Sequence, residues 1–237
     1  MKNSSFQFKQ FAVQQDKCAM KISTDGVILG AYAGQGNPKK ILDIGAGTGV
    51  ISLMLAQRFP EAMITGIEID KDASKQASEN IRNSPWNNRI RILNQSFQEF
   101  SKHHQDKFDL IVSNPPYFPN HLKTEDYQRN LAMHNDTLPF EELMAGIKSM
   151  MDQEATSWLI LPPYQMEETN KIAEVLRLFA FEKLKIQDKP AKNIIRLIQG
   201  FSFLKKDLKI SGLSIKDEDN KYSKVYSDLL KEFLIIF

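Results

Sequence analysis

Short apolar runs alternate with longer segments of helical periodicity from residue 40 onward. The short runs are β-branched in several places, which is typical of strands buried on both faces of a sheet. They cover residues 41–45, 63–69, 90–95, 108–114 and 156–161. Apolar residues at helical spacing predict helices over 73–81, 139–150 and 172–179. Strands that alternate with helices of this length indicate an α/β fold, Rossmann-like and doubly wound, with right-handed crossovers between parallel strands.

The N-terminal part carries a different pattern. Alternation around Phe6 and Phe8, followed by the run 17–22, predicts a hairpin of two short strands. A short helix follows, and either Ser23 or Thr24 can cap it, because a hydroxyl oxygen accepts a free amide hydrogen of the first turn.

The C-terminal part is predicted to complete one domain. Residues 181–188 and 193–204 indicate two strands around a turn, and the apolar face over 222–234 indicates a last helix that docks on the core. No repeat or long linker interrupts the chain. We therefore expect a single domain over 1–237, made of an N-terminal hairpin and helix extension (1–37), a Rossmann-like core (38–205) and a C-terminal extension (206–237).

Composition sets the broad class of the protein. The chain has 237 residues, of which 42% are hydrophobic and 25% charged, as in ordinary globular proteins. Its net charge of +2 neither demands nor excludes a nucleic-acid partner. The single cysteine, Cys18, excludes an internal disulfide, and we expect it to be a small packed side chain. Because no apolar run approaches roughly 20 residues and no signal peptide is evident, we expect a soluble, cytoplasmic protein without a membrane partner.

A glycine-rich loop follows the first predicted strand of the core, in the run ILDIGAGTG (41–49). Gly45, Gly47 and Gly49 lack a Cβ, so the chain can turn sharply and a ligand can approach the backbone. Val50 stands where the nicotinamide fingerprint requires its last glycine, which argues against a dinucleotide.

Two acidic residues accompany the glycine loop. Asp43 lies at the end of the preceding strand and suits a ligand with an ammonium group, whereas Glu68 ends the next strand and suits the hydroxyls of a ribose. A structural strand-to-helix turn and a solvated strand end are the alternatives, but the glycines and both acids together favour a cofactor. An ammonium group and a ribose without a pyrophosphate indicate S-adenosylmethionine.

The fourth predicted strand ends in Asn114, Pro115, Pro116 and Tyr117. An aromatic amine is a weak nucleophile, and two acceptors for its hydrogens free the lone pair of its nitrogen. Asn114 supplies a side-chain carbonyl and Pro115 a backbone carbonyl, which Pro116 aims outward by restricting Pro115 to an extended conformation. Tyr117 offers a flat surface for a planar substrate. The tetrapeptide therefore predicts methylation of an amine or amide nitrogen.

This chemistry is a direct displacement at the methyl carbon, so alignment of the reactants dominates catalysis. No metal or covalent enzyme intermediate is required. His103 and His104 are predicted to lie in a polar loop, His121 and His134 are isolated, and none has ligand spacing with a cysteine or acid. We therefore expect no metal site.

Motifs that carry a family resemblance extend over nearly the whole chain. They are FKQF (8–11), DKCAMK (16–21), TDG (24–26), LGA (29–31), LDIGAGTG (42–49), SPW (84–86), NPPY (114–117) and YS (222–223) with Tyr226. On these motifs the chain resembles the bacterial transfer-RNA adenine N6-methyltransferases that modify the adenosine next to the valine anticodon. The resemblance implies a class I S-adenosylmethionine-dependent methyltransferase fold, with a seven-stranded, mostly parallel sheet whose last strand is antiparallel.

The resemblance also assigns site residues by position. It implies that Asn114, Pro115, Pro116 and Tyr117 hold the target base. The cofactor residues that it implies are Asp43, Gly45, Ala46, Gly47, Glu68 and Asn114, with Thr24 near the methionine end and Ser96 near the adenine. Family members often carry aspartate at the position of Ser96, and a serine in a loop is often only a turn residue.

An RNA substrate fits the local charge. Residues 183–209 contain eight basic and two acidic side chains, net +6, and the N-terminal hairpin adds four lysines against one acid. Solvated lysines on ordinary strands are the alternative, but a cluster beside the site would attract RNA phosphates. The adenine must be unstacked, which is easiest in a single-stranded loop such as an anticodon. We expect a monomer.

The same tetrapeptide also serves methyltransferases that act on other substrates. These substrates are the glutamine amide of release factors, the amino group of guanine in ribosomal RNA, and adenine in DNA. From a different class, the chain could be an RNA-binding scaffold that only retains the cofactor fold, although intact Asp43 and Asn114 argue against this. A nicotinamide oxidoreductase is disfavoured by Val50 and by the lack of a hydride-transfer arrangement of histidine or lysine.

Overall fold

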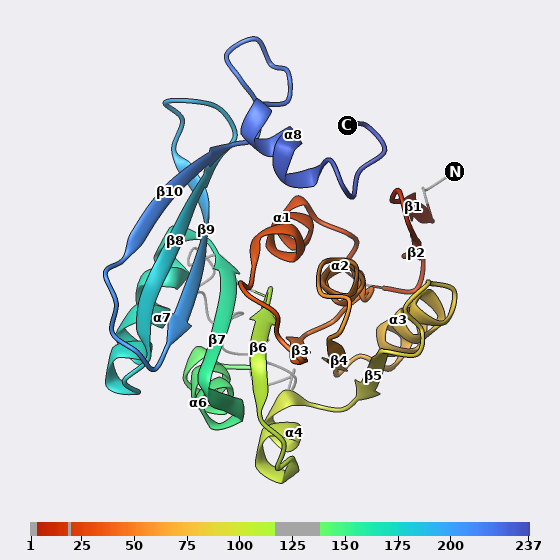
Figure 1. Cartoon of the computed structure of the whole chain (residues 1–237), viewed down its shortest axis with the longest axis vertical. Coiled ribbons are helices and arrows are strands. Elements are labelled where there is room, and N and C mark those ends of the chain that lie inside the picture. Colours follow the sequence, from red (N-terminus) through yellow and green to blue (C-terminus); the bar gives the residue numbers. More distant parts are fainter. Residues whose placement is uncertain (1–3, 19, 117–137) are drawn as a thin grey trace, which may run out of the picture.

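The computed structural model describes residues 4–18, 20–116 and 138–237. Its central sheet consists of β3 (Lys40–Ile44), β4 (Met63–Glu68), β5 (Ile90–Asn94), β6 (Phe108–Ser113), β7 (Met151–Leu161), β8 (Phe179–Gln187), β9 (Ile194–Ser202) and β10 (Lys209–Ser214). The strands lie in the order β10-β8-β9-β7-β6-β3-β4-β5 (Figure 1). All neighbours are parallel except that β9 is antiparallel to β7 and β8. The predicted α/β class and the five predicted core strands are confirmed.

Counted over the described residues, the sheet has eight strands rather than the expected seven. The additional strand, β10, pairs with β8 at the edge of the sheet, so the antiparallel strand is β9 and not the last one. The first four residues of β10 are exposed. Leu213 is the one buried residue of the strand, so β10 carries too little apolar alternation to give a strand signal.

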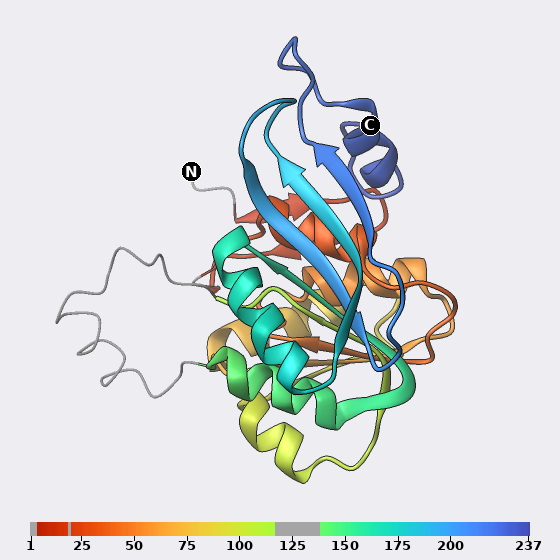
Figure 2. The same ribbon diagram turned by 90° about the vertical axis from the view of Figure 1, so that its left-hand side faces the viewer.

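Helices cover both faces of the sheet (Figures 1 and 2). One face packs against α1 (Thr24–Tyr32), α2 (Val50–Arg58), α3 (Lys71–Arg82) and α8 (Lys224–Leu230). The other packs against α4 (Phe97–His103), α6 (Phe140–Met150) and α7 (Pro163–Val175). The two apolar clusters are separate, and the sheet lies between them. Within the described residues, no helix combines the length and apolar character needed to cross a membrane.

The N-terminal hairpin exists, but its second strand was placed wrongly. It consists of β1 (Ser5–Gln7) and β2 (Ala12–Gln14), which pair antiparallel, so the second strand precedes the predicted run 17–22. The segment after β2 pairs with a side chain of α3 instead of with a strand: Gln76 bonds the Lys17 N–H and the Asp16 carboxylate. Ser23 caps α1, because its Oγ accepts the Gly26 N–H at 3.2 Å.

Several helix and strand boundaries differ from the predicted ones. The helix over 172–179 ends at Val175 as part of α7, because Arg177 is left-handed (φ 58°), and Phe179 already belongs to β8. β7 begins at residue 151 rather than 156, and α8 stops at Leu230. The sequence pattern did not predict α4.

Candidate functional site

The loop between β3 and α2 forms one wall of the candidate site. Gly45, Gly47 and Gly49 have φ angles of 76°, 55° and 81°, a conformation that strongly favours glycine. A Cβ added to Gly45 would meet no atom within 4 Å. The loop backbone therefore faces open space that a ligand can enter.

Glu68 ends β4 beside this loop, and backbone amides fix its carboxylate. The Gly47 N–H donates to Oε2 at 2.7 Å, and the Asp70 N–H donates to Oε1 at 2.9 Å. The residue is 9% exposed. Because a carboxylate oxygen has two lone pairs, each oxygen retains capacity to accept from a ligand hydroxyl.

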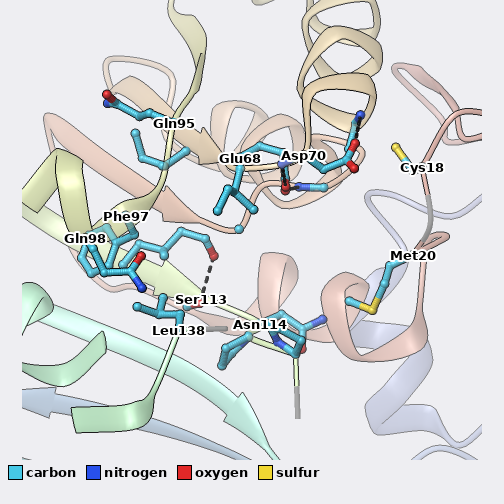
Figure 3. A pocket seen from close by; sticks show the side chains of 18 residues that line it. Cys18, Met20, Glu68, Asp70, Gln95, Phe97, Gln98, Ser113, Asn114 and Leu138 are labelled. Atoms are coloured by element: carbon cyan, nitrogen blue, oxygen red, sulfur yellow. Dashed lines mark hydrogen bonds between the residues drawn. The ribbon is translucent and has the colours of Figure 1, made fainter. Parts of the chain in front are cut away.

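A pocket opens where β3, β4 and β6 end, and Figure 3 shows the side chains around it. Six residues singled out from the sequence line this pocket: Gly45, Gly47, Glu68, Asn114, Pro115 and Pro116. The parallel strands thus bring the glycine loop, the acid and the Asn-Pro-Pro corner together, although they are far apart in the chain. Ligands of open α/β sheets bind at this end of the strands.

β6 delivers Asn114 to the pocket, and its end is fixed to β3. Ser113, the last residue of β6, donates from Oγ to the Ile44 carbonyl at 2.9 Å. The start of α1 lies nearby, since a Cβ at Gly26 would stand 3.8 Å from Asn114 Nδ2. Tyr117 lies outside the described residues, and its stacking role stays a prediction.

Asp43 lies behind the glycine loop and does not line the pocket. It is fully buried, and its Oδ2 accepts from Ser52 Oγ at 2.7 Å. Oδ1 has no hydrogen-bond partner among the residues that the structure describes. Burial raises the pKa of Asp43 to about 6, and the nearby negative charge of Glu68 adds to the effect. An unpartnered buried oxygen at this position fits a site that is completed by a ligand or by water.

Three other residues assigned to the cofactor lie outside the pocket lining. Ser96 Oγ accepts the Glu99 N–H at 3.2 Å, so its side chain caps α4 and is not directed at a ligand. Thr24 is exposed at the start of α1, and Ala46 is buried, with its N–H donating to the Ile67 carbonyl. The structure therefore gives no direct pocket contact to these three side chains.

The pocket also contains residues that the sequence analysis missed. Figure 3 shows Cys18 and Met20 on one side and Gln95, Phe97 and Gln98 on the opposite side. Cys18, expected to be a simple packing residue, thus contributes to the wall. Burial raises its pKa to about 11. Gln95 directly follows β5, so its position at the end of a strand was the available signal.

The two histidines that the structure describes belong to a helix end and to an aromatic stack. His103 ends α4 rather than lying in a loop, and the His104 ring stacks on Phe100 and Phe108 with centroid distances of 4.3 and 5.9 Å. His121 and His134 lie outside the described residues. Within residues 4–18, 20–116 and 138–237, no group of three or more potential metal ligands is found.

The loop lysines of the predicted basic cluster are divided between the two ends of the sheet. Lys189 and Lys192 lie in the connection from β8 to β9, at the pocket end, whereas Lys205 and Lys206 lie in the connection from β9 to β10, at the other end. Figure 2 shows these two connections at opposite ends of the strands. β8 has nine residues, and at about 3.3 Å per residue it separates the two groups by roughly 30 Å. The expectation of one cluster beside the site was therefore wrong.

Solved structures share this architecture. A predicted O-methyltransferase from Agrobacterium tumefaciens is 18% identical and superimposes with a TM-score of 0.71, covering 88% of this chain and 96% of the other. A TehB-like SAM-dependent methyltransferase from Corynebacterium glutamicum is 20% identical, with a TM-score of 0.52 and coverage of 79% and 90%. These similarities show the fold, which is that of class I S-adenosylmethionine-dependent methyltransferases.

Sequence comparison identifies the family. Residues 29–136 match the methyltransferase small domain. A tRNA1(Val) (adenine(37)-N6)-methyltransferase of Bacteroides thetaiotaomicron is 41% identical over 236 residues, which are 99% of this chain and 99% of that protein. Similarity at this level over the full length, together with the pocket at the ends of β3, β4 and β6, places the protein: the chain belongs to the tRNA1(Val) (adenine(37)-N6)-methyltransferase family.

Proposed function

We propose that this protein methylates the N6 nitrogen of an adenine in transfer RNA, with S-adenosylmethionine as methyl donor. The proposed target is adenosine 37 of a valine transfer RNA, the substrate in the name of the curated relative. The observation that carries the proposal is the convergence of Gly45, Glu68 and Asn114 on one pocket. This combination serves a donor that bears a ribose and an acceptor that bears an amino group.

The residues around the glycine loop fit the donor. Gly45 leaves open space beside the backbone, and Glu68 is oriented to accept hydrogen bonds from ribose hydroxyls. We assign to Asp43 an indirect role: its Oδ1, which has no partner among the described residues, lies behind the loop and favours a positive charge near the methionine end. When bound, S-adenosylmethionine supplies an electrophilic methyl group on a sulfonium sulfur.

The Asn-Pro-Pro corner fits the acceptor. The Asn114 side-chain carbonyl and the Pro115 backbone carbonyl accept the two hydrogens of the adenine amino group. These bonds concentrate the lone pair on N6 and orient it, and two positioned acceptors supply most of what this displacement requires from the enzyme. The flat face of Tyr117 is proposed to stack on the base, with a gain of about 1–3 kcal/mol.

The proposal also covers the RNA loop that is recognised, the oligomeric state and domain organisation of the enzyme, and its location in the cell. The anticodon loop presents its adenine unpaired, so less unstacking is required than in a duplex. We propose that the chain acts as a monomer and as one domain over 1–237, with the ranges 1–37, 38–205 and 206–237 as parts of that domain. A transfer-RNA substrate implies work in the cytoplasm.

The direct test is methyl transfer from radiolabelled S-adenosylmethionine. An unmodified valine transfer-RNA transcript is compared with the same transcript carrying guanosine at position 37, and the labelled nucleoside is identified by digestion and mass spectrometry. Ribosomal RNA, DNA and release-factor protein serve as competing acceptors. N6-methyladenosine from the first transcript alone supports the proposal, whereas label in another acceptor, or none in RNA, contradicts it.

A further inference from the structure

A segment of the N-terminal region crosses α3 and reaches the pocket. This segment, residues 14–18, is called the strap. It starts at the end of β2 and ends at Cys18, which is 6% exposed and lines the pocket. Met20 lines the same side (Figure 3). The strap therefore belongs to the pocket wall, although it lies outside the sheet.

Asn80 of α3 binds the strap in the manner of a neighbouring strand. Its Oδ1 accepts the Gln14 N–H at 2.8 Å, and its Nδ2 donates to the Gln14 carbonyl at 2.9 Å. One side-chain amide thus satisfies both backbone groups of one strap residue. Asn80 is 2% exposed, so water cannot readily replace these bonds.

Gln76, one helical turn before Asn80, makes the second attachment. Its Oε1 accepts the Lys17 N–H at 3.0 Å, and its Nε2 donates to Asp16 Oδ1 at 2.7 Å. Residues four apart lie on the same face of a helix, so both amides point toward the strap. Gln76 is 1% exposed.

Asn80 also connects the strap to the glycine loop. Its Nδ2 donates a further hydrogen bond to the Thr48 carbonyl, at 2.9 Å. Gly49 packs against the same helix, since an added Cβ there would stand 3.4 Å from the Ala77 Cβ. A single buried amide therefore holds both the strap and the glycine loop, two segments that contribute residues to the pocket.

We propose that Gln76 and Asn80 are positioning residues that hold the strap against α3 and in register with the glycine loop, so that the strap forms a wall of the cofactor pocket. The inference rests on the proposed function, because it takes S-adenosylmethionine as the ligand of this pocket. It predicts that loss of either amide weakens cofactor binding and leaves the chemistry of the bound complex intact.

Cys18 provides a direct probe of the strap, because it is the single cysteine of the chain. In the wild type its burial and high pKa make the thiol react slowly. In Asn80→Ala and Gln76→Ala the strap loses hydrogen-bond partners, and its polar groups can then be hydrated only if the strap moves away from α3. We therefore expect labelling of Cys18 by a thiol reagent at pH 8 to be more than about tenfold faster in both variants. S-adenosylhomocysteine should protect Cys18 in the wild type.

Cofactor affinity is measured in parallel by calorimetry with S-adenosylhomocysteine. The two variants should bind about tenfold more weakly, while kcat at saturating donor changes less than about twofold. Ser84→Ala is the matched control: Ser84 is buried after the end of α3 and donates to the Ile81 carbonyl at 2.8 Å, away from the strap. It should lower stability without changing labelling or affinity. Gln76→Ala leaves the Thr48 bond in place, so it keeps the test available if Asn80→Ala does not fold.

The outcomes separate the inference from the proposed function. Wild-type affinity and labelling in both folded variants would overturn the inference alone. A loss of kcat equal to the loss of affinity, or the same changes in Ser84→Ala, would also overturn it. Wild-type protein that does not bind S-adenosylhomocysteine would instead overturn the proposed function, and with it the cofactor part of the inference.

Discussion

The two ends of the parallel strands differ in how completely their polar groups are paired. We call the ends of β3, β4 and β6, with the pocket, the carboxyl edge, and the starts of the same strands the amino edge. Both edges carry charged side chains and helix termini. Among the residues that the structure describes, only the carboxyl edge combines left-handed glycines with a buried carboxylate oxygen that has no partner.

At the amino edge the charged groups bind the protein itself. Asp109 Oδ2 accepts the backbone N–H groups of Lys39 and Lys40 at 2.6 and 2.8 Å. The Arg89 guanidinium donates to three backbone carbonyls: those of Ala56 and Phe59 at the end of α2, and that of Ala62 in the following loop. Helix C-termini leave carbonyls without partners, and a guanidinium satisfies several at once.

At the carboxyl edge the polar groups are held in position but can still accept hydrogen bonds from a ligand. Glu68 is held by two backbone amides, Asp43 Oδ1 has no partner among the described residues, and Gly45 faces open space. The comparison teaches that charge alone does not mark a site in this molecule. Among the described residues, the combination of left-handed glycines, a carboxylate held by backbone amides and a buried carboxylate oxygen without a partner distinguishes the binding edge from the structural edge.

The largest expected effect concerns Asn114. Asn114→Ala removes an acceptor for the adenine amino group, so kcat should fall by about 10²–10³-fold, as for loss of one positioned hydrogen-bonding group elsewhere. The affinity for S-adenosylhomocysteine should change less than about threefold. Single-turnover methyl transfer and calorimetry measure the two quantities. Turnover near the wild-type value would remove Asn114 from the proposed mechanism.

The second prediction is that ionised Asp43, at the carboxyl edge, lowers the free energy of unfolding at neutral pH. Because burial raises its pKa from 3.8 to about 6, the folded state binds more protons than the unfolded state in this window, and stability falls as pH rises through it. Asp43→Asn should therefore raise the free energy of unfolding at pH 7 by up to about 3 kcal/mol, with no gain near pH 4. Urea unfolding between pH 4 and 8 tests this. A variant that is less stable at pH 7 would contradict the sign.

One variant at each edge, measured for both cofactor affinity and stability, sharpens the comparison. Glu68→Ala should weaken cofactor binding about 10–100-fold, because hydrogen bonds to a charged group are lost. Arg89→Met, at the amino edge, should lower the free energy of unfolding by about 2 kcal/mol and leave cofactor affinity unchanged. Calorimetry and urea unfolding on both variants check the pattern. If Arg89→Met also weakened binding, the two edges would not be separable.

The smallest effect concerns the lysines. Replacing Lys189 and Lys192 by glutamine should weaken transfer-RNA binding several-fold and reduce the salt slope by about 1–2, because each phosphate contact contributes about 0.7–0.9. The same change at Lys205 and Lys206 is the matched control at the amino edge and should have little effect. Binding is measured by filter retention between low and high salt. A larger effect of the control pair would place the RNA path at the other edge.

Local patterns in the sequence were sufficient for much of the fold. The five core strands, the hairpin of β8 and β9, and the capped helix α1 all follow from periodicity and turn chemistry. The pattern failed where burial is absent or one-sided, as in β10, and where a single backbone angle ends an element, as at Arg177. Such features depend on neighbours that a short window does not contain.

The sequence by itself determined which groups the site contains: glycines where the backbone is left-handed, an acid at the next strand end and the Asn-Pro-Pro corner. These depend on residue type at fixed distances from strand ends, which is local information. Tertiary structure decided the rest: that Ser96 caps a helix, that Asp43 lies behind the loop, that the lysines divide between two edges and that Gln76 and Asn80 hold the strap. These facts depend on strand order and helix packing, which join residues that are distant in the chain and leave no periodic signal in it.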